Sequence, residues 1–206
     1  MKQKKEKLGI MGGTFDPIHI GHLMLAEWAK EAASLDRILF IPAGSPYMKG
    51  HVTEGAMRLQ MVQKAIQKNP SFESCGMEIE RQGKTYTYET VERLQKEYPD
   101  SELYFIMGAD CLFSIENWRE PQRIFQGCKV IAAARNGSSL DRMKEKQKEL
   151  MTRFHADILL LSFPAVDISS TEIRRRVLKG ESVRYMVPDE VNDNILKYHL
   201  YQSEVQ

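Results

Sequence analysis

The sequence has few cysteines, almost no net charge and no long apolar run. Three cysteines among 206 residues, Cys75, Cys111 and Cys128, show no paired spacing, which excludes a disulfide-stabilised secreted scaffold and favours a reducing compartment. A formal charge of +1 gives no overall attraction to nucleic acid. No apolar stretch approaches the roughly 20 residues of a membrane span, and residues 1–7 lack the apolar core of a secretory signal. We therefore expect a cytoplasmic protein that binds neither nucleic acid nor membrane.

Short apolar segments alternate with longer amphipathic ones along the whole chain, and 42% hydrophobic and 28% charged residues are typical of a folded protein. We predict strands over 8–11, 37–41, 74–80, 103–107, 129–133 and 158–161, and helices over 20–33, 56–68, 88–97, 139–153, 170–178 and 189–201. In the second helix, Leu59, Val62 and Ile66 are spaced to face the core. This alternation predicts an α/β fold with a Rossmann-like, doubly wound parallel sheet. We expect one domain over residues 1–206, with a small helical C-terminal part from about residue 168.

A glycine-rich turn that leads into two histidines is the densest motif. It reads Gly12-Gly13-Thr14-Phe15-Asp16-Pro17-Ile18-His19-Ile20-Gly21-His22 and joins a predicted strand to a predicted helix. Glycines let backbone N–H groups approach a ligand, and the helix N-terminus adds unpaired N–H groups and the positive end of a dipole. The two histidines share one face of the first turn and can donate to phosphate oxygens. The motif predicts a site for a phosphate chain. A metal site at His-x-x-His is the weaker alternative, because no Cys, Asp or Glu nearby completes it.

A second motif lies near the other end of the chain and reads Ile168-Ser169-Ser170-Thr171-Glu172-Ile173-Arg174. Ser169 and Glu172 have the spacing of a capping box, and Ile168 and Ile173 that of a hydrophobic staple, so the segment could simply begin a helix. A helix start rich in hydroxyls with a cation in the next turn also suits a triphosphate. Taken by itself, this motif supports the helix-start and the phosphate-binding interpretations equally. Beside the first motif, the phosphate-binding one is favoured.

These two motifs resemble those of the nucleotidylyltransferase superfamily, whose signature is a glycine-rich loop running into His-x-Gly-His. From about Gly9 to about Val191 the chain is similar to bacterial nicotinate-nucleotide adenylyltransferases. The segments that carry this second likeness are Thr85-Tyr86-Thr87, Gly108-Ala109-Asp110 with Trp118 after it, Arg135, and Val183-Arg184-Tyr185-Met186-Val187-Pro188. One departure stands out: the lysine loop of the family commonly reads Pro-Pro-His-Lys, whereas Met48 precedes Lys49 here.

The resemblance implies transfer of the adenylyl group of ATP to nicotinate mononucleotide, with Mg²⁺ bound to the ATP and no metal ligand supplied by the chain. It assigns catalytic roles to His19, His22, Lys49 and Arg174. It implies ATP contacts at Gly12, Gly13, Thr14, Phe15, His19, His22, Gly108, Asp110, Ile168, Ser169, Ser170, Thr171 and Arg174. It implies mononucleotide contacts at Thr14, Lys49, Thr85, Tyr86, Thr87, Trp118, Arg119 and Arg135. Bacterial members of the family often pair as homodimers, so a homodimer is compatible with the resemblance.

Other functions share parts of this pattern. Nicotinamide mononucleotide and phosphopantetheine adenylyltransferases use the same first motif, although the latter are shorter and match the middle segments less well. Class I aminoacyl-tRNA synthetases also contain His-x-Gly-His, but they need a lysine-rich second signature and an RNA-binding domain. A regulatory module that binds ATP without turnover would keep the same two phosphate-binding motifs. A dehydrogenase is disfavoured, because the first loop lacks Gly-x-Gly-x-x-Gly.

Overall fold

The computed structural model describes residues 5–44, 52–135, 140–164 and 166–202. Its strands form a six-stranded sheet in the order β3-β2-β1-β4-β5-β6. The strands are β1 (Glu6–Gly13), β2 (Arg37–Pro42), β3 (Phe72–Ser74), β4 (Ser101–Gly108), β5 (Lys129–Arg135) and β6 (Ile158–Phe163). The pairs β1–β4, β4–β5 and β5–β6 are parallel. This is the strand order of a doubly wound nucleotide-binding sheet, whose direction of winding reverses between β1 and β4. The predicted fold class is confirmed.

Nine helical segments connect and follow the strands in the described part of the chain. They are α1 (Ile20–Ala33), α2 (Gly55–Ile66), α3 (Thr87–Glu97), α4 (Ala109–Ser114), the 3₁₀ turn η1 (Ile115–Asn117), α5 (Pro121–Gly127), α6 (Leu140–Phe154), α7 (Ser170–Leu178) and α8 (Asp189–Lys197). The predicted bounds of α1 and α7 match to the residue. No helix among the described residues is long and apolar enough to cross a membrane.

Three sequence-based expectations about the elements were wrong. The strand expected over 74–80 ends at Ser74, because the chain then turns, with the N–H of Ile79 bonded to the carbonyl of Gly76 at 2.9 Å. The last helix ends at Lys197 rather than at residue 201. The short helices α4, η1 and α5 were not foreseen, because segments of three to seven residues are too short to show a helical hydrophobic period.

The buried face of α2 differs from the predicted stripe in one telling way. Val62 and Ile66 are buried as expected, but Leu59 is only half-buried. The other two buried residues of the helix are Met61 and Arg58, and Arg58 is 1% exposed. Arg58, Val62 and Ile66 are spaced four residues apart, so an arginine occupies a position that the helical period reserves for the core.

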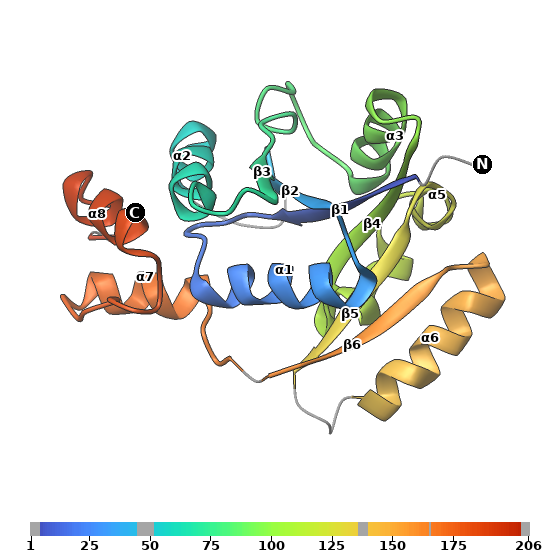
Figure 1. Ribbon diagram of the computed structural model, residues 1–206. Helices are drawn as coiled ribbons and strands as arrows, with labels where there is room; N and C mark the ends of the chain where they lie inside the picture. Colours follow the sequence, from blue (N-terminus) through green and yellow to red (C-terminus); the bar gives the residue numbers. More distant parts are fainter. Residues whose placement is uncertain (1–4, 45–51, 136–139, 165, 203–206) are drawn as a thin grey trace. The chain divides into compact units, whose positions relative to one another are not determined.

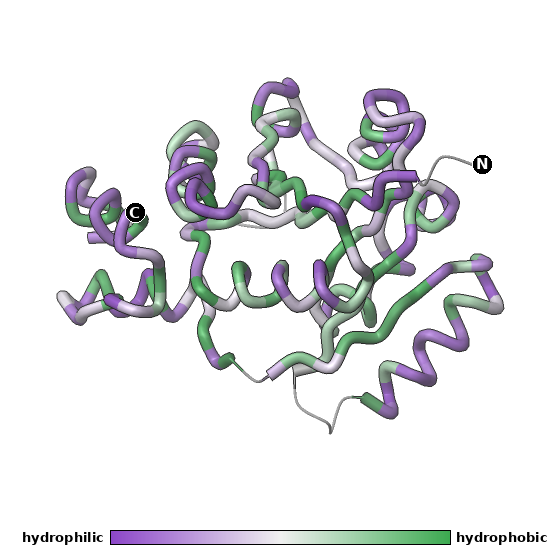
Figure 2. The backbone as a smooth tube through the Cα atoms, in the orientation of Figure 1, coloured by the Kyte–Doolittle hydropathy of each residue, from purple (hydrophilic) through white to green (hydrophobic). Residues whose placement is uncertain are grey.

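The described residues group into two compact units. The first unit comprises 1–12, 25–39 and 85–165, and the second comprises 13–24, 40–84 and 166–206. In the first unit α3 lies beside α5, and α6 lies along β6 (Figure 1). Strand β6 is mostly hydrophobic, whereas α6 is largely hydrophilic with Met143 and Leu150 buried (Figure 2). In the second unit α2 packs against β3 and α8.

Candidate functional site

The glycine-rich turn folds tightly over an aromatic ring in the second unit. Phe15 is 2% exposed and has a left-handed backbone, with φ of 49°. A Cβ added to Gly13 would lie 3.1 Å from the Phe15 ring, and one added to Gly21 would lie 3.1 Å from the His19 ring. Real Cβ atoms rarely come that close, so these two positions favour glycine for reasons of space. The same turn thereby brings backbone N–H groups and the two histidines into one short segment.

The histidines of this segment form a stacked pair. His19 immediately precedes α1 and is 4% exposed, and its ring lies 3.7 Å from that of His22, centroid to centroid. The backbone N–H of His19 donates to Nδ1 of His22 at 3.2 Å. Because Nδ1 accepts, neutral His22 carries its proton on Nε2, which makes that atom a donor. Phe15 packs edge-on against His22 at 5.1 Å and fixes the ring from another side.

Helix α7 begins directly against this loop. Ser170 Oγ donates to the carbonyl of Pro17 at 2.9 Å, and Arg174 Nη1 donates to the carbonyl of Asp16 at 2.7 Å. Residues about 150 positions apart in the chain are therefore neighbours within the second unit. The arrangement places a hydroxyl-rich helix start and a guanidinium beside the loop that carries His19, and both features favour anions.

The predicted capping box of α7 is half formed. Ser169 caps the helix by accepting the backbone N–H of Glu172 at 3.1 Å. The Glu172 carboxylate pairs instead with Arg175, with 2.6 Å between Oε1 and Nη2. The bonds from Arg175 lower the pKa of Glu172. Thr171, in the first turn, is exposed and accepts from Arg174 Nη2 at 3.5 Å.

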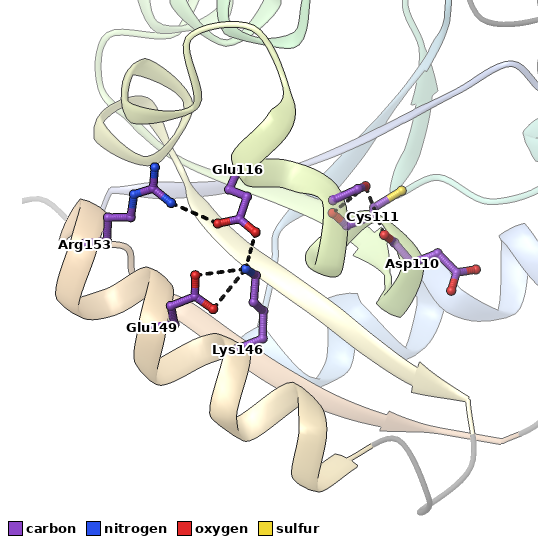
Figure 3. Close-up of polar contacts among 7 residues, drawn as sticks. Asp110, Cys111, Glu116, Lys146, Glu149 and Arg153 are labelled. Atoms are coloured by element: carbon purple, nitrogen blue, oxygen red, sulfur yellow. Dashed lines mark hydrogen bonds and ion pairs between the residues drawn. The ribbon is translucent and has the colours of Figure 1, made fainter.

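A second group of predicted residues lies in the first unit, where β4 ends. Gly108 is its last residue, and Asp110 is exposed in the first turn of α4. No described atom lies within 4 Å of a Cβ built on Gly108, so the protein leaves open space there. Asp110 projects away from the nearby ion pairs (Figure 3). Space and an exposed carboxylate at the carboxyl end of a central strand suit a nucleoside.

Ion pairs fix the segment that follows Asp110. Glu116 of η1 accepts from Lys146 at 2.5 Å and from Arg153 at 3.0 Å, both on α6 (Figure 3). Lys146 also contacts Glu149 at 3.0 Å. The bond from Lys146 lowers the pKa of Glu116. The network ties η1 to α6, and Trp118 follows η1 directly.

Trp118 and Arg119 lie close to aromatic rings of the first unit. Trp118 is half-buried and packs edge-on against Phe105, with 6.2 Å between ring centres. The Arg119 guanidinium lies 4.8 Å from the centre of the Tyr86 ring and donates to the Tyr86 hydroxyl at 3.3 Å. Tyr86 occupies the N-cap position of α3, which begins at Thr87 as the sequence indicated to within one residue. The structure thus brings together Tyr86 and Arg119, two residues predicted to bind the mononucleotide.

Several predicted residues carry less structural information. Lys49 and Met48 lie outside the described residues, and Arg135 is described only through its backbone, the last residue of β5. Gly12 is exposed, and Thr85 and Ile168 are half-buried. Thr14 contributes its carbonyl to a bond from Arg58 at 2.7 Å.

Sequence reasoning missed two residues that hold the loop. Arg58 donates to the carbonyl of Thr14 in this loop, and the hydroxyl of Tyr201 donates to Asp16 Oδ1 at 2.7 Å. The four-residue spacing of Arg58, Val62 and Ile66 could have revealed the arginine, because it puts a charge on a core-facing stripe. Nothing in the sequence around Tyr201 indicates its partner.

Comparison with known proteins gives the family of this chain. The profile of the cytidylyltransferase-like family matches residues 10–176. A "Probable nicotinate-nucleotide adenylyltransferase" of Clostridium tetani is 41% identical over 199 residues, covering 96% of this chain and 100% of the relative. Its namesake in Lachnoclostridium phytofermentans is 42% identical over 197 residues, covering 95% and 98%.

Solved structures show the same fold. Plasmodium falciparum nicotinic acid mononucleotide adenylyltransferase complexed with NaAD aligns with a TM-score of 0.78 at 22% identity, over 98% of this chain and 100% of that one. The same protein complexed with APC aligns with a TM-score of 0.77 at 21% identity, over the same shares. From its sequence relatives and the family profile, the chain belongs to the cytidylyltransferase-like family and, within it, to the nicotinate-nucleotide adenylyltransferases.

Proposed function

We propose that this protein transfers the adenylyl group of ATP to nicotinate mononucleotide, forming deamido-NAD and pyrophosphate. One observation supports the proposal above others: Ser170 and Arg174 of α7 bond to the backbone of Pro17 and Asp16, beside His19. Two motifs that the sequence predicts to bind phosphate, one near each end of the chain, are in contact there. The relatives that share nearly the full length of the chain carry the name of this activity.

The reaction needs positioning and charge stabilisation rather than a covalent enzyme intermediate. The ionised phosphate of the mononucleotide attacks the α-phosphorus of ATP in line, a new P–O bond forms, and the bond to the pyrophosphate oxygen breaks. We assign His19 to the α-phosphate. Nε2–H of His22 and the guanidinium of Arg174, together with Lys49, stabilise charge that moves toward the leaving pyrophosphate. Backbone N–H groups of Gly13 and Thr14, together with the start of α7, complete the proposed binding site for the ATP phosphates.

The remaining predicted residues recognise the two nucleosides. Gly108 and Asp110, with the segment from Ile168 to Thr171, are assigned to adenosine. Trp118 is assigned to the nicotinate ring, which it can stack against. Backbone N–H groups near Thr85 and Arg119 would bind the ring carboxylate. Charge-assisted bonds favour a carboxylate, whereas an amide brings donors that oppose those N–H groups. The acid is therefore the preferred substrate.

The ATP is proposed to carry Mg²⁺. Among the described residues no three His, Cys, Asp or Glu side chains gather at one point. Mg²⁺ in such sites usually keeps several waters and binds substrate phosphates, so we propose that phosphate oxygens and water hold it here. When bound, the ion neutralises part of the charge on the β- and γ-phosphates. The chain's own groups, His19, His22 and Arg174, hold the phosphates in line. We place the reaction in the cytoplasm.

A side-by-side rate measurement tests the function. The purified protein is incubated with ATP, Mg²⁺ and one acceptor at a time: nicotinate mononucleotide, nicotinamide mononucleotide or phosphopantetheine. Pyrophosphate release and the dinucleotide product are both followed. We expect release that depends on nicotinate mononucleotide, with the amide slower by about tenfold or more, because one charge-assisted bond is lost. Equal rates for acid and amide would contradict the proposed specificity. ATP binding without release from any acceptor would indicate a regulatory module.

A further inference from the structure

Arg58 is the most deeply buried charged residue among those described, and it touches the predicted ATP loop. It is 1% exposed on the inner face of α2. Its guanidinium bonds to four backbone carbonyls: Nε to Thr53 at 2.8 Å, Nη1 to Thr14 at 2.7 Å, and Nη2 to Ala43 at 2.7 Å and Gly44 at 3.1 Å. All four acceptors belong to the second unit. A side chain that uses its donors in this way organises backbone and contacts no substrate itself.

The bonds to carbonyls also decide where N–H groups point. Asp16–Pro17 is the cis peptide bond of this loop, and the Thr14–Phe15 and Ala43–Gly44 units are trans. In a planar trans unit the C=O and the next N–H point in opposite directions. Because Arg58 draws the carbonyls of Thr14 and Ala43 toward itself, the N–H groups of Phe15 and Gly44 face away from it. The carbonyl oxygens of Thr14 and Ala43 therefore point toward Arg58, and the N–H groups of Phe15 and Gly44 point to the opposite side.

Arg58 has a buried counter-charge that belongs to the same loop. Asp16 is 4% exposed and accepts from the backbone N–H of Thr53 at 3.2 Å. It also accepts from the hydroxyl of Tyr201 at 2.7 Å. Burial lowers the pKa of Arg58, and the charge of Asp16 opposes that effect. Burial also raises the pKa of Tyr201, with Asp16 adding to it, so the phenol stays protonated and donates.

The same guanidinium holds both flanks of the lysine loop. Ala43 and Gly44 precede that loop in the sequence, Thr53 follows it, and Lys49 lies between them. Thr14, at the glycine-rich turn, is the fourth attachment. One planar cation therefore holds Thr14, which the family resemblance assigns to ATP and mononucleotide binding, beside both flanks of the loop that contains Lys49. Only arginine offers five donors in a fixed fork, so a lysine cannot reproduce the set.

We propose that Arg58 is a positioning residue for ATP: it fixes the Thr14–Phe15 and Ala43–Gly44 peptide units so that N–H groups, not carbonyl oxygens, face the triphosphate. Asp16 and Tyr201 hold the loop around it. The inference rests on the proposed function. It assigns no chemical step to Arg58, whose effect on phosphate binding passes through the backbone.

The test compares Arg58→Lys with a matched destabilising variant, Val62→Ala, one turn further along the buried face of α2. Binding of a non-hydrolysable ATP analogue is measured by titration calorimetry well below the Tm of each variant. The KM values for ATP and for nicotinate mononucleotide are measured separately. We expect Arg58→Lys to weaken the analogue by about tenfold or more, because several carbonyls lose their donor. The KM for ATP should rise with it, while that for the mononucleotide changes less. Val62→Ala should lower Tm without changing analogue affinity.

Several outcomes would overturn the inference. If Arg58→Lys melts at a lower temperature but binds the analogue as the wild type does, the residue is structural only. If Arg58→Lys does not fold, the test instead compares analogue binding by Tyr201→Phe with analogue binding by Tyr198→Phe. Tyr198 is an exposed tyrosine of the same segment and serves as the control. We expect only Tyr201→Phe to weaken the analogue, and equal affinities would overturn the inference. A wild type that binds the analogue but releases no pyrophosphate refutes the proposed function alone. One that binds no analogue refutes both.

Discussion

His19 and His22 matter as a pair because each fixes the other. The rings stack at 3.7 Å, and the N–H of His19 occupies Nδ1 of His22. Gly21 makes room for the His19 ring, since a Cβ there would come within 3.1 Å of it. A donor that is already oriented costs little reorganisation when charge develops on a phosphate, which is why such donors contribute strongly to catalysis.

Replacing His19 tests its assignment to the α-phosphate. We expect His19→Asn to lower kcat by about 10²–10³-fold, the usual cost of losing one preorganised donor to a transition state. The matched control is His155→Asn, an exposed histidine with φ of 53°, a conformation that asparagine adopts readily. Steady-state turnover of both variants is compared with the wild type. A His19→Asn enzyme with nearly normal turnover would remove His19 from the mechanism.

A substitution at Gly108 tests the adenosine assignment without a large change in the stability of the protein. No described atom lies within 4 Å of a Cβ at this position, and its φ of −82° suits any residue. Gly108→Ala should therefore leave the free energy of unfolding within about 0.5 kcal/mol of the wild type. If ATP lies there, the added methyl group meets it, and the KM for ATP rises while the mononucleotide KM does not. Unchanged KM values would mean that adenosine binds elsewhere.

Helix α7 combines a side-chain cap with two bonds to the loop of the candidate site. Ser169 caps it, Ser170 anchors it to Pro17, and Arg174 anchors it to Asp16. The cap leaves the first turn well formed, and the anchors direct that turn toward the loop of His19. A helix start held in this way presents N–H groups and a positive dipole end to an anion without further ordering.

The cap of α7 gives a prediction at this scale. Ser169→Ala removes the bond to the Glu172 N–H and should destabilise the protein by about 1 kcal/mol in urea unfolding. The matched control is Ser182→Ala, which removes a similar bond to the N–H of Arg184 beyond the end of α7. We expect both variants to lose stability and only Ser169→Ala to raise the KM for ATP. Equal KM effects would argue that the start of α7 makes no contact with ATP.

At the scale of the whole molecule, the second unit gathers its parts from three distant stretches of chain. Residues 166–202 contact the segment of the glycine-rich turn and the start of α1 at three places: through α7, through the carbonyl of Met186, which accepts the N–H of Ile20 at 3.0 Å, and through Tyr201. The C-terminal helices are therefore a support for the candidate site. The first unit is braced near the start of its sheet, where Glu6 accepts from Arg37 at 2.7 Å and from Ser101 at 2.8 Å.

Glu6 should contribute to the acid sensitivity of folding. The bond from Arg37, followed by that from Ser101, lowers the pKa of Glu6 below its ordinary value of 4.5. A carboxylate with a depressed pKa stabilises the fold above its unfolded pKa and loses that contribution as the pH falls through the folded one. Because the side chain is 35% exposed, solvent screening limits the effect to about 1 kcal/mol or less. Glu6→Gln should have a lower free energy of unfolding than the wild type at pH 7. The difference should vanish once the pH falls below the pKa of Glu6 in the folded protein.

Urea unfolding at a series of pH values measures this difference. Glu31→Gln, an exposed carboxylate at the end of α1, serves as the control and should follow the wild type throughout. A Glu6→Gln curve that stays parallel to that of the wild type down to pH 2 would show that the Arg37 pair does not titrate with folding.

Part of this protein follows from its sequence by local physics. The bounds predicted for α1 and α7 match the structure to the residue. The spacing of glycine, hydroxyl and histidine residues also predicts two candidate phosphate-binding motifs, which stay a prediction. Helix starts and tight turns are decided by neighbours in the chain, which is why they can be predicted. The short segment from α4 to α5 could not be found in this way, because it is too short to carry a period.

The sequence alone determined that a glycine-rich loop and a hydroxyl-rich helix start are both present, since each depends on residues within a few positions of one another. Only the tertiary structure decided that Arg174 reaches Asp16, that Tyr201 reaches the same residue, and that Arg58 holds four carbonyls. Those bonds join residues up to 185 positions apart in the chain, and backbone carbonyls are chemically alike in every residue. Which of them a buried guanidinium binds is therefore settled by packing and not by residue type.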